Sequence, residues 1–289
     1  MDVIYRTLTL DDNVAVTGID LEEALSEAVK HFSLSDTAAT ACGRLLLSMA
    51  FLSSSIKGVG ERYTAVIDGK GGLGQLVGRA DSDGSIRCSV ENPAFECEMY
   101  AHSRQSIKQA VGVDGTLTVI HDLGLKEPYI GKTALVNGEI SDDFAYYFTF
   151  SQQTPSAVAM GVKVQNGKVL RCVGIFAQLL PQCPDHIITM LEDIVSMYTH
   201  LDTADKNAKQ IILDSFDHLG IKWLDEQHPV YRCDCTKQKI DALVKSVGYD
   251  EAISILDAEG KISVVCEFCN RRYDYDRKAI DKLFSKNKA

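Results

Sequence analysis

Four cysteines near the C-terminus constrain this chain more than any other feature of its sequence. They form two tight pairs, Cys-x-Cys and Cys-x-x-Cys, made of Cys233, Cys235, Cys266 and Cys269. Two such pairs, separated by a few tens of residues, can supply four thiolates to one tetrahedral zinc ion. Four thiolates leave no open coordination position, so metal-catalysed hydrolysis is not expected. The spacing therefore predicts one structural Zn²⁺ held by these cysteines.

The sequence around the pairs fits a metal-stabilised domain. Residues 230–289 are too small and too polar to fold on hydrophobic burial alone, which is the usual setting for a structural metal. His228 lies near the first pair and could replace a ligand, but four cysteines make it unnecessary. The first pair departs from the Cys-x-x-Cys spacing that most zinc ribbons use in both halves.

This spacing has a mechanical consequence. Both pairs permit a local disulfide, and a disulfide within a pair ties nothing across the residues between the pairs, whereas zinc does. Structural zinc contributes roughly 10–16 kcal/mol of apparent folding free energy in small domains. A disulfide that closes a very short loop returns little of it. We therefore expect oxidation to release zinc, to unfold this domain and to undock the helical segment before it.

The other five cysteines follow no spacing pattern: Cys42, Cys88, Cys97, Cys172 and Cys183. Cys42 falls in an apolar helical run, and three others fall in segments of strand character. We interpret all five as reduced core thiols. Residues 1–10 do not form a secretory signal, and Arg44 interrupts the longest apolar stretch, so we expect a cytoplasmic protein that does not interact with membranes.

Residues 1–178 predict an α+β domain. Helices are expected over Asp20–Phe32, with a capping box of Asp20 and Glu23, and over Asp36–Ser55, capped by Asp36. The second helix is apolar nearly all round, so it should be largely buried. Strands are expected over Arg62–Asp68, Gln75–Ala80, Ile86–Val90, Thr116–His121, Lys132–Asn137, Phe144–Phe150, Ser156–Val164 and Val169–Gln178. Such a succession of strands favours antiparallel sheet.

The glycine-rich run 69–74 is interpreted as a turn between strands. It lacks the Gly-Lys-Ser/Thr ending of a phosphate-binding loop, and a strand rather than a helix follows it. Nothing in the run therefore predicts a nucleotide site.

Two further parts follow the first domain. Residues 179–229 predict a helical linker without strands, with helices over Asp185–Leu201 and Asp205–Leu219 whose apolar faces must pack on another part of the protein. Residues 230–289 predict a small zinc-binding domain. It should contain helices over Thr236–Val247 and Tyr249–Ala258 and a strand over Ile262–Val265. The expected architecture is a mainly antiparallel β-sheet N-terminal domain around a largely buried helix, a helical linker and the zinc domain.

Several motifs carry a family resemblance that spans essentially the whole chain. They are Val230-Tyr231-Arg232-Cys233-Asp234-Cys235, Val265-Cys266-Glu267-Phe268-Cys269-Asn270, Gly71-Gly72-Leu73-Gly74, residues 110–117 (AVGVDGTL), Asp122-Leu123-Gly124-Leu125, Gly138-Glu139-Ile140 and Ser151-Gln152-Gln153-Thr154-Pro155-Ser156. The chain resembles the heat-shock protein 33 family, the redox-regulated bacterial holdase chaperones. Leu73 stands where this family often has proline, which affects a turn and not the cysteines.

The resemblance implies a function in oxidative stress. It implies an ATP-independent, non-enzymatic chaperone of the cytoplasm that is inactive when reduced and zinc-bound. Peroxide or hypochlorite, together with unfolding conditions, would form the disulfides Cys233–Cys235 and Cys266–Cys269, release zinc and disorder the linker. The active form would tend to dimerise and would bind unfolded or oxidatively damaged client proteins to prevent their aggregation.

Two other functions remain open from the residues. A zinc-ribbon nucleic-acid-binding module would use the basic residues near the second pair, although Asp274, Asp276 and Asp281 interleave with them and the net charge of −10 disfavours broad binding of nucleic acid. A thiol-disulfide oxidoreductase would use Cys266 and Cys269, but such pairs usually open a helix in a βαβ unit.

Overall fold

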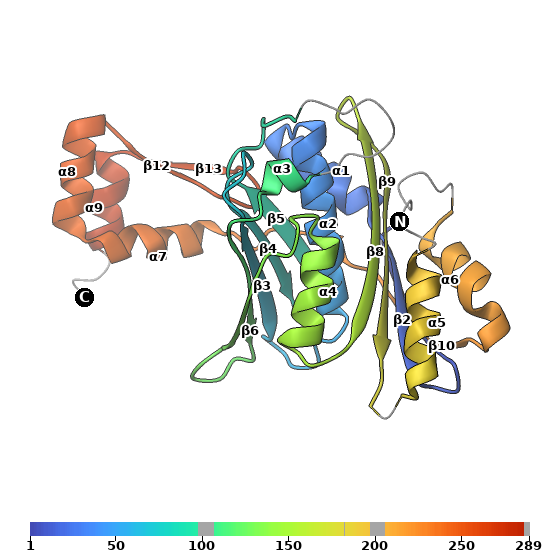
Figure 1. Cartoon of the computed structure of the whole chain (residues 1–289). Helices are drawn as coiled ribbons and strands as arrows, with labels where there is room; N and C mark the ends of the chain where they lie inside the picture. The colour runs from blue at the N-terminus through green and yellow to red at the C-terminus, as the bar shows by residue number, and fades with distance from the viewer. Residues whose placement is uncertain (98–106, 182, 197–205, 286–289) are drawn as a thin grey trace. The chain divides into compact units, whose positions relative to one another are not determined.

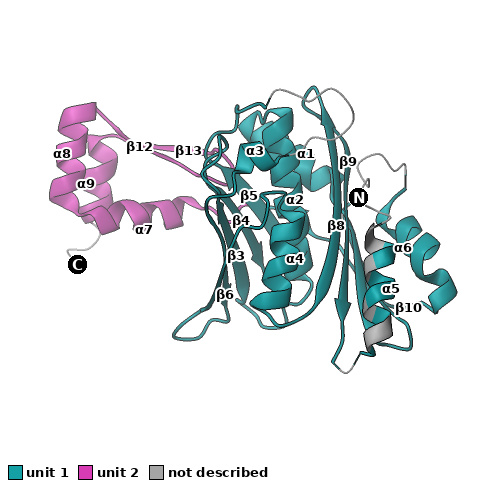
Figure 2. Cartoon of the chain, viewed as in Figure 1, with its two compact units in different colours: residues 1–232 teal, residues 233–289 magenta. Residues whose placement is uncertain are grey.

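The computed structural model describes residues 1–97, 107–181, 183–196 and 206–285 of the chain. It contains two compact units, residues 1–232 and residues 233–289 (Figure 2). The first unit contains the two large sheets and the helices that pack on them, and the second is a small α+β unit that contains the four predicted zinc ligands.

Two sheets form the frame of the first unit (Figure 1). Sheet A has the order β10-β1-β2-β9-β8, with β1 (Val3–Thr9), β2 (Val14–Asp20), β8 (Ser156–Gln165), β9 (Lys168–Leu179) and β10 (Lys222–Gln227). Sheet B has the order β11-β5-β4-β3-β6-β7, with β3 (Arg62–Asp68), β4 (Leu76–Asp81), β5 (Ser85–Val90), β6 (Thr116–Asp122), β7 (Tyr129–Ala134) and β11 (Val230–Tyr231). Neighbouring strands are antiparallel, which confirms that prediction, except that β11 runs parallel to β5. The glycine-rich run lies between β3 and β4, as predicted.

Helix α2 (Asp36–Ser53) lies at the centre of this unit and contacts strands of both sheets. Nearly all of its residues are buried, as its apolar sequence predicted. Close packing depends on glycine: a Cβ at Gly78 of β4 would lie 2.7 Å from Cγ of Met49, and one at Gly43 would lie 2.9 Å from Leu25. Among the described residues, no helix combines the length and the apolar character needed to cross a lipid bilayer.

The predicted helix caps were wrong because other residues provide them: a distant one for the first helix and a neighbouring one for the second. Helix α1 (Glu22–Phe32) has no side-chain cap at its N-cap residue, and Asp2 instead accepts hydrogen bonds from the backbone N–H groups of Glu23 and Ala24. Ser35 rather than Asp36 caps α2 by accepting from the Ala38 N–H. The Asp36 carboxylate accepts from the backbone of the β8–β9 turn at residues 166 and 167.

The expected strand Phe144–Phe150 is a helix, α4 (Ser141–Phe150). Its closely spaced aromatic residues fit either periodicity, and tertiary contacts select the helix. Phe144, Tyr147 and Phe148 lie on one buried face at helical spacing. The buried carboxylate of Asp143 fixes the helix start by accepting from the backbone N–H of Ile140 and of Val136. The structure also adds β1, β2 and the short helix α3 (Lys108–Val111), and it places β7 three residues earlier than predicted.

The predicted linker contains α5 (Asp185–Ser196), α6 (Ala208–Phe216), a 3₁₀ turn, η2 (Asp217–Leu219), and then β10. The expectation of no strand was therefore wrong. Strand β10 lies at the edge of sheet A and is exposed along most of its length, so it lacks an apolar pattern. The predicted helix to residue 201 extends beyond the described residues.

Helices α5 and α6 cover one face of sheet A and form a second hydrophobic core with it. Its fully or nearly fully buried members include Ile187, Leu191, Ile194, Ile211, Ile212 and Phe216 from the helices and Val14, Val16, Val173, Ile175 and Ala177 from β2 and β9. The approach is close, because a Cβ at Gly18 would lie 2.6 Å from Cδ1 of Ile212. The apolar faces of the linker helices thus pack on the N-terminal sheet.

The second unit contains α7 (Lys237–Val247), α8 (Tyr249–Glu259), β12 (Ile262–Val265), β13 (Arg272–Tyr275) and α9 (Arg277–Ser285). Strand β12 and the first two helices agree with the predicted elements, whereas β13 and α9 were not predicted. Its core is small, with Ile240, Val244, Ala252, Leu256, Tyr275 and Ile280 as the buried members. So little apolar burial leaves a need for another source of stability.

Candidate metal centre

The four cysteines of the two pairs meet in the second unit. Their Sγ atoms all lie within 4.8 Å of one another. The closest contacts join one pair to the other: Sγ of Cys233 lies 3.5 Å from Sγ of Cys266, and Sγ of Cys235 lies 3.3 Å from Sγ of Cys269. The fold thus brings together the four residues that the sequence proposed as ligands.

A tight hairpin presents the second pair. Strands β12 and β13 are antiparallel, with Val265 opposite Arg272, and the cysteines lie in the turn between them. The Cys266 N–H donates to the carbonyl of Arg271 over 2.9 Å, and the Asn270 N–H donates to the carbonyl of Cys266 over 2.8 Å. Asn270 has a φ of 54°, which asparagine tolerates better than most residues. Backbone hydrogen bonds therefore fix the turn that carries Cys266 and Cys269.

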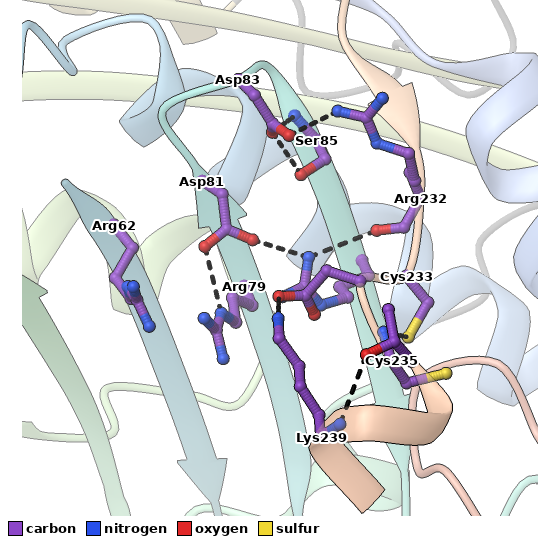
Figure 3. Close-up of polar contacts among 12 residues, drawn as sticks. Arg62, Arg79, Asp81, Asp83, Ser85, Arg232, Cys233, Cys235 and Lys239 are labelled. Atoms are coloured by element: carbon purple, nitrogen blue, oxygen red, sulfur yellow. Dashed lines mark hydrogen bonds and ion pairs between the residues drawn. The ribbon is translucent and has the colours of Figure 1, made fainter. Parts of the chain in front are cut away.

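The first pair precedes α7. The Cys235 N–H donates to Sγ of Cys233 over 3.4 Å, and Thr236 caps the helix by accepting from the Lys239 N–H. Lys239 also forms an ion pair with Asp234, between the two cysteines, over 2.5 Å (Figure 3). A hydrogen-bonded turn anchored to a helix start thus fixes this pair.

The donor set fits a tetrahedral metal ion. With metal–sulfur bonds of about 2.3 Å, a tetrathiolate site has sulfur–sulfur edges of about 3.8 Å. The contacts of 3.3 and 3.5 Å between the pairs are slightly shorter than this, and all four sulfurs lie within 4.8 Å. Four sulfurs without carboxylate or imidazole favour a soft, thiolate-binding ion. Cys233, Cys235, Cys266 and Cys269 could therefore hold one metal ion.

The thiols differ in their acidity. Burial raises the pKa of Cys233 well above its ordinary value and raises the pKa of Cys269 to about 11. Burial also acts to raise the pKa of Cys235, but hydrogen bonds from Tyr273 and the neighbouring thiols outweigh it and lower that pKa to about 7. Four thiolates so close together need a cation to balance their charge, and a coordinating metal deprotonates its thiol ligands.

The remaining candidates lie in the first unit. Cys42, Cys88 and Cys172 are buried in the core, as predicted. Cys97 and Cys183 are partly exposed and pack at the edges of the hydrophobic cores, so the core assignment is wrong for these two. The ring of His228 contacts the carbonyl of Asp2 at 3.1 Å and does not belong to the cysteine cluster.

A polar network that the sequence did not reveal fixes the chain just before Cys233 (Figure 3). Strand β11 pairs with β5, and the fully buried Arg87 donates to the carbonyl of Arg232 over 3.2 Å. Arg87 also forms an ion pair of 2.7 Å with Asp81, and Arg232 forms one of 2.5 Å with Asp83. Arg232 is more than a hundred residues from both Arg87 and Asp83 along the chain, so no local pattern could indicate these two contacts.

The surroundings of the second pair bear on the alternatives. Arg272 forms an ion pair with Asp274, and Arg277 forms one with Asp257, so nearby carboxylates offset these basic side chains. Cys266 and Cys269 follow a strand rather than opening a helix, which is where exchanging pairs gain their acidity. Neither a nucleic-acid surface nor an exchanging pair gains support from these contacts.

The chain is similar to known proteins along nearly its whole length. The family profile described as Hsp33 protein matches residues 2–276. The 33 kDa chaperonin of Clostridium tetani is 35% identical over 288 residues, covering 98% of this chain and 97% of the relative. That of Caldanaerobacter subterraneus is 33% identical over 286 residues, with the same coverage of 98% and 97%.

A solved structure agrees with these relatives. The crystal structure of the 33 kDa chaperonin, a heat shock protein 33 homolog, from Thermotoga maritima superposes with a TM-score of 0.89 at 28% identity. The match covers 99% of this chain and 98% of that one. The fold, the cysteine cluster and the sequence relatives agree, and the chain therefore belongs to the Hsp33 family of chaperones.

Proposed function

We propose that this protein is a cytoplasmic, ATP-independent holdase whose activity is switched on by oxidation of its cysteine cluster. In the reduced state Cys233, Cys235, Cys266 and Cys269 would hold one Zn²⁺, and the protein would be inactive. The observation that carries the proposal is the convergence of the four sulfurs within 4.8 Å in a unit with a small hydrophobic core. Membership of a chaperone family supports client binding as the output.

Oxidation would remove the metal ion that links the two pairs. Each pair of zinc-bound thiolates would react with one hydrogen peroxide and two protons to give one disulfide and two waters, and the two sulfurs would cease to be metal ligands. The family resemblance implies the disulfides Cys233–Cys235 and Cys266–Cys269. Neither would connect residues 233–235 to residues 266–269, so the second unit would lose the stabilisation that metal binding supplies.

Unfolding of the second unit would then release the linker. Helices α5 and α6 pack apolar side chains on β2 and β9, and undocking would expose both surfaces. A large contiguous apolar patch of this kind is typical of a protein-binding site. We propose that unfolded or oxidatively damaged clients bind there and that the same exposed surface favours a dimer of the oxidised form.

The test is light scattering of a chemically unfolded client protein during dilution, with zinc content and thiol count measured on the same samples. We expect one zinc in the reduced protein, and no zinc and four fewer thiols after peroxide at raised temperature. Only the oxidised sample should suppress aggregation. Equal suppression by both samples, or metal and thiols retained after peroxide, would contradict the switch.

Disulfide mapping by peptide mass spectrometry tests the pairing. The sulfurs in closest contact belong to different pairs, Cys233 with Cys266 and Cys235 with Cys269. Disulfides across the pairs would keep the two halves linked and would contradict the proposed uncoupling. A Cys97→Ser variant is the matched control, because this cysteine lies outside the cluster.

A further inference from the structure

Tyr273 of β13 contacts the metal centre from outside the set of four ligands. Its hydroxyl oxygen lies 3.5 Å from Sγ of Cys235, within hydrogen-bonding distance of sulfur. A phenol can donate a hydrogen bond, and a metal-bound thiolate can accept one. The contact therefore adds an outer hydrogen bond to one of the four proposed ligands.

This hydrogen bond joins the two halves of the site. Tyr273 lies opposite Val264 in the β12–β13 hairpin that presents Cys266 and Cys269, whereas Cys235 belongs to the other pair. The other outer contacts described for the cluster are local, such as the Cys235 N–H donating to Cys233. Tyr273 thus links the second-pair hairpin to a first-pair sulfur by a route that does not pass through the metal.

The chemistry of the two groups fixes the direction of the hydrogen bond. A metal-bound thiolate carries no hydrogen and can only accept, so the Tyr273 hydroxyl is the donor to Cys235. The ring packs against the hydrophobic core of the second unit, which holds the hydroxyl in place.

We propose that Tyr273 is a positioning residue of the metal centre, which holds Cys235 as a ligand and slows both metal loss and oxidation at that sulfur. The inference rests on the proposed function for the metal and its oxidation. A hydrogen bond to a thiolate withdraws electron density from the sulfur, so the sulfur attacks peroxide less readily. Outer-shell partners of this kind typically change metal affinity by about 10–100-fold when removed.

The test compares Tyr273→Phe with Tyr275→Phe in the full-length, zinc-loaded, reduced protein. Both changes remove one hydroxyl from β13, but the Tyr275 hydroxyl donates to Asp241 over 2.7 Å rather than to a cysteine. The first readout is the rate of zinc transfer to a chromogenic chelator in reducing buffer, where no disulfide can form. We expect about tenfold faster transfer from Tyr273→Phe and a rate near wild type for Tyr275→Phe.

The second readout is the loss of each free thiol during limited peroxide treatment, measured by alkylation and mass spectrometry. Cys235 should lose its thiol faster in Tyr273→Phe than in the wild type or in Tyr275→Phe. Wild-type rates in Tyr273→Phe would overturn the inference while leaving the redox switch intact. Equal acceleration in both variants would also overturn it, because it would mean a general loosening of the second unit.

Discussion

The buried carboxylate of Asp20, at the end of β2, accepts hydrogen bonds of 3.1 Å from the backbone N–H of Ala208, the first residue of α6 and 188 positions further along the chain. Both oxygens take part. A residue of the N-terminal sheet therefore supplements the N-cap residue Asn207 and ties the start of a linker helix to the sheet.

Docking of α6 should depend on pH through Asp20. Burial raises its pKa to about 6, while the bond from Ala208 acts in the opposite direction. The pKa of Asp20 in the docked state exceeds its ordinary value of 3.8, so the docked form binds the proton more tightly. Protonation of Asp20 therefore stabilises docking of α6 fully below about pH 4, and this stabilisation is lost as pH rises through about 6. The free energy of docking should change by at most about 3 kcal/mol between these two pH limits.

Hydrogen exchange of the α6 amides, corrected for intrinsic rates, measures this effect. The opening free energy of wild-type α6 should fall between pH 5 and pH 7, and Asp20→Asn should remove that fall. Asp36→Asn is the control, since Asp36 caps the β8–β9 turn instead. The same pH dependence in Asp20→Asn and wild type would refute the assignment to Asp20.

The apolar face of α6 should hold the linker in its docked state. Phe216 is 1% exposed in the second core, whereas Leu213 on the same helix is 37% exposed. Truncation of a buried phenylalanine costs about 3–5 kcal/mol. Phe216→Ala should therefore undock α6 and suppress client aggregation without oxidation, in a light-scattering assay. Leu213→Ala should behave like wild type. If reduced Phe216→Ala lost hydrogen-exchange protection in α6 but did not suppress aggregation, undocking of α6 would not be sufficient for client binding.

Loss of one cysteine of the cluster should unfold the second unit and leave the central helix α2 of the first unit folded. In Cys269→Ser the cluster retains three thiolates, and the small core of this unit cannot replace the stabilisation from a metal. We expect hydrogen-exchange protection to disappear across residues 237–285 and to persist in α2. Cys183→Ser, outside the cluster, should retain the wild-type pattern. Full protection of α7–α9 in Cys269→Ser would show that the unit folds without metal.

Arg87 should control release of the chain just before Cys233. It donates to the carbonyl of Arg232, so Arg87→Ala should free the end of β11 and speed cleavage by trypsin after Arg232 in the native, reduced protein. Arg79→Ala is a matched control, because Arg79 pairs with Asp81 but has no described contact with Arg232. Equal cleavage rates in the two variants would mean that the bond from Arg87 does not hold this segment.

Features that depend on local spacing could be predicted from the sequence. The spacing of the cysteine pairs predicts a shared site, because a tetrahedral ion takes its donors from short turns. In the structure the four sulfurs lie within 4.8 Å of one another. The apolar circumference of α2 likewise requires burial on all sides, and the structure places that helix between the two sheets.

Features that depend on distant partners could not be predicted. The sequence predicts that Asp20 caps the helix that follows it, but its carboxylate accepts from the first backbone N–H of α6. The Arg87–Arg232 contact has no local signature. Strand β10 is exposed, so it carries no apolar alternation, and the aromatic run of α4 fits two periods until the buried Asp143 fixes a helix start.

The linker ends with β10, and β11 follows it directly; these two strands close the edges of different sheets. Strand β10 covers the outer edge of β1, and β11 covers the outer edge of β5. Release of this segment would therefore expose apolar side chains and would also remove the backbone hydrogen-bond partners of β1 and β5. Each sheet would then have an edge strand with unpaired N–H and C=O groups. Open strand edges pair with any extended chain, whatever its side chains. An unfolded polypeptide offers such a chain, so sequence-independent capture would follow from the backbone itself.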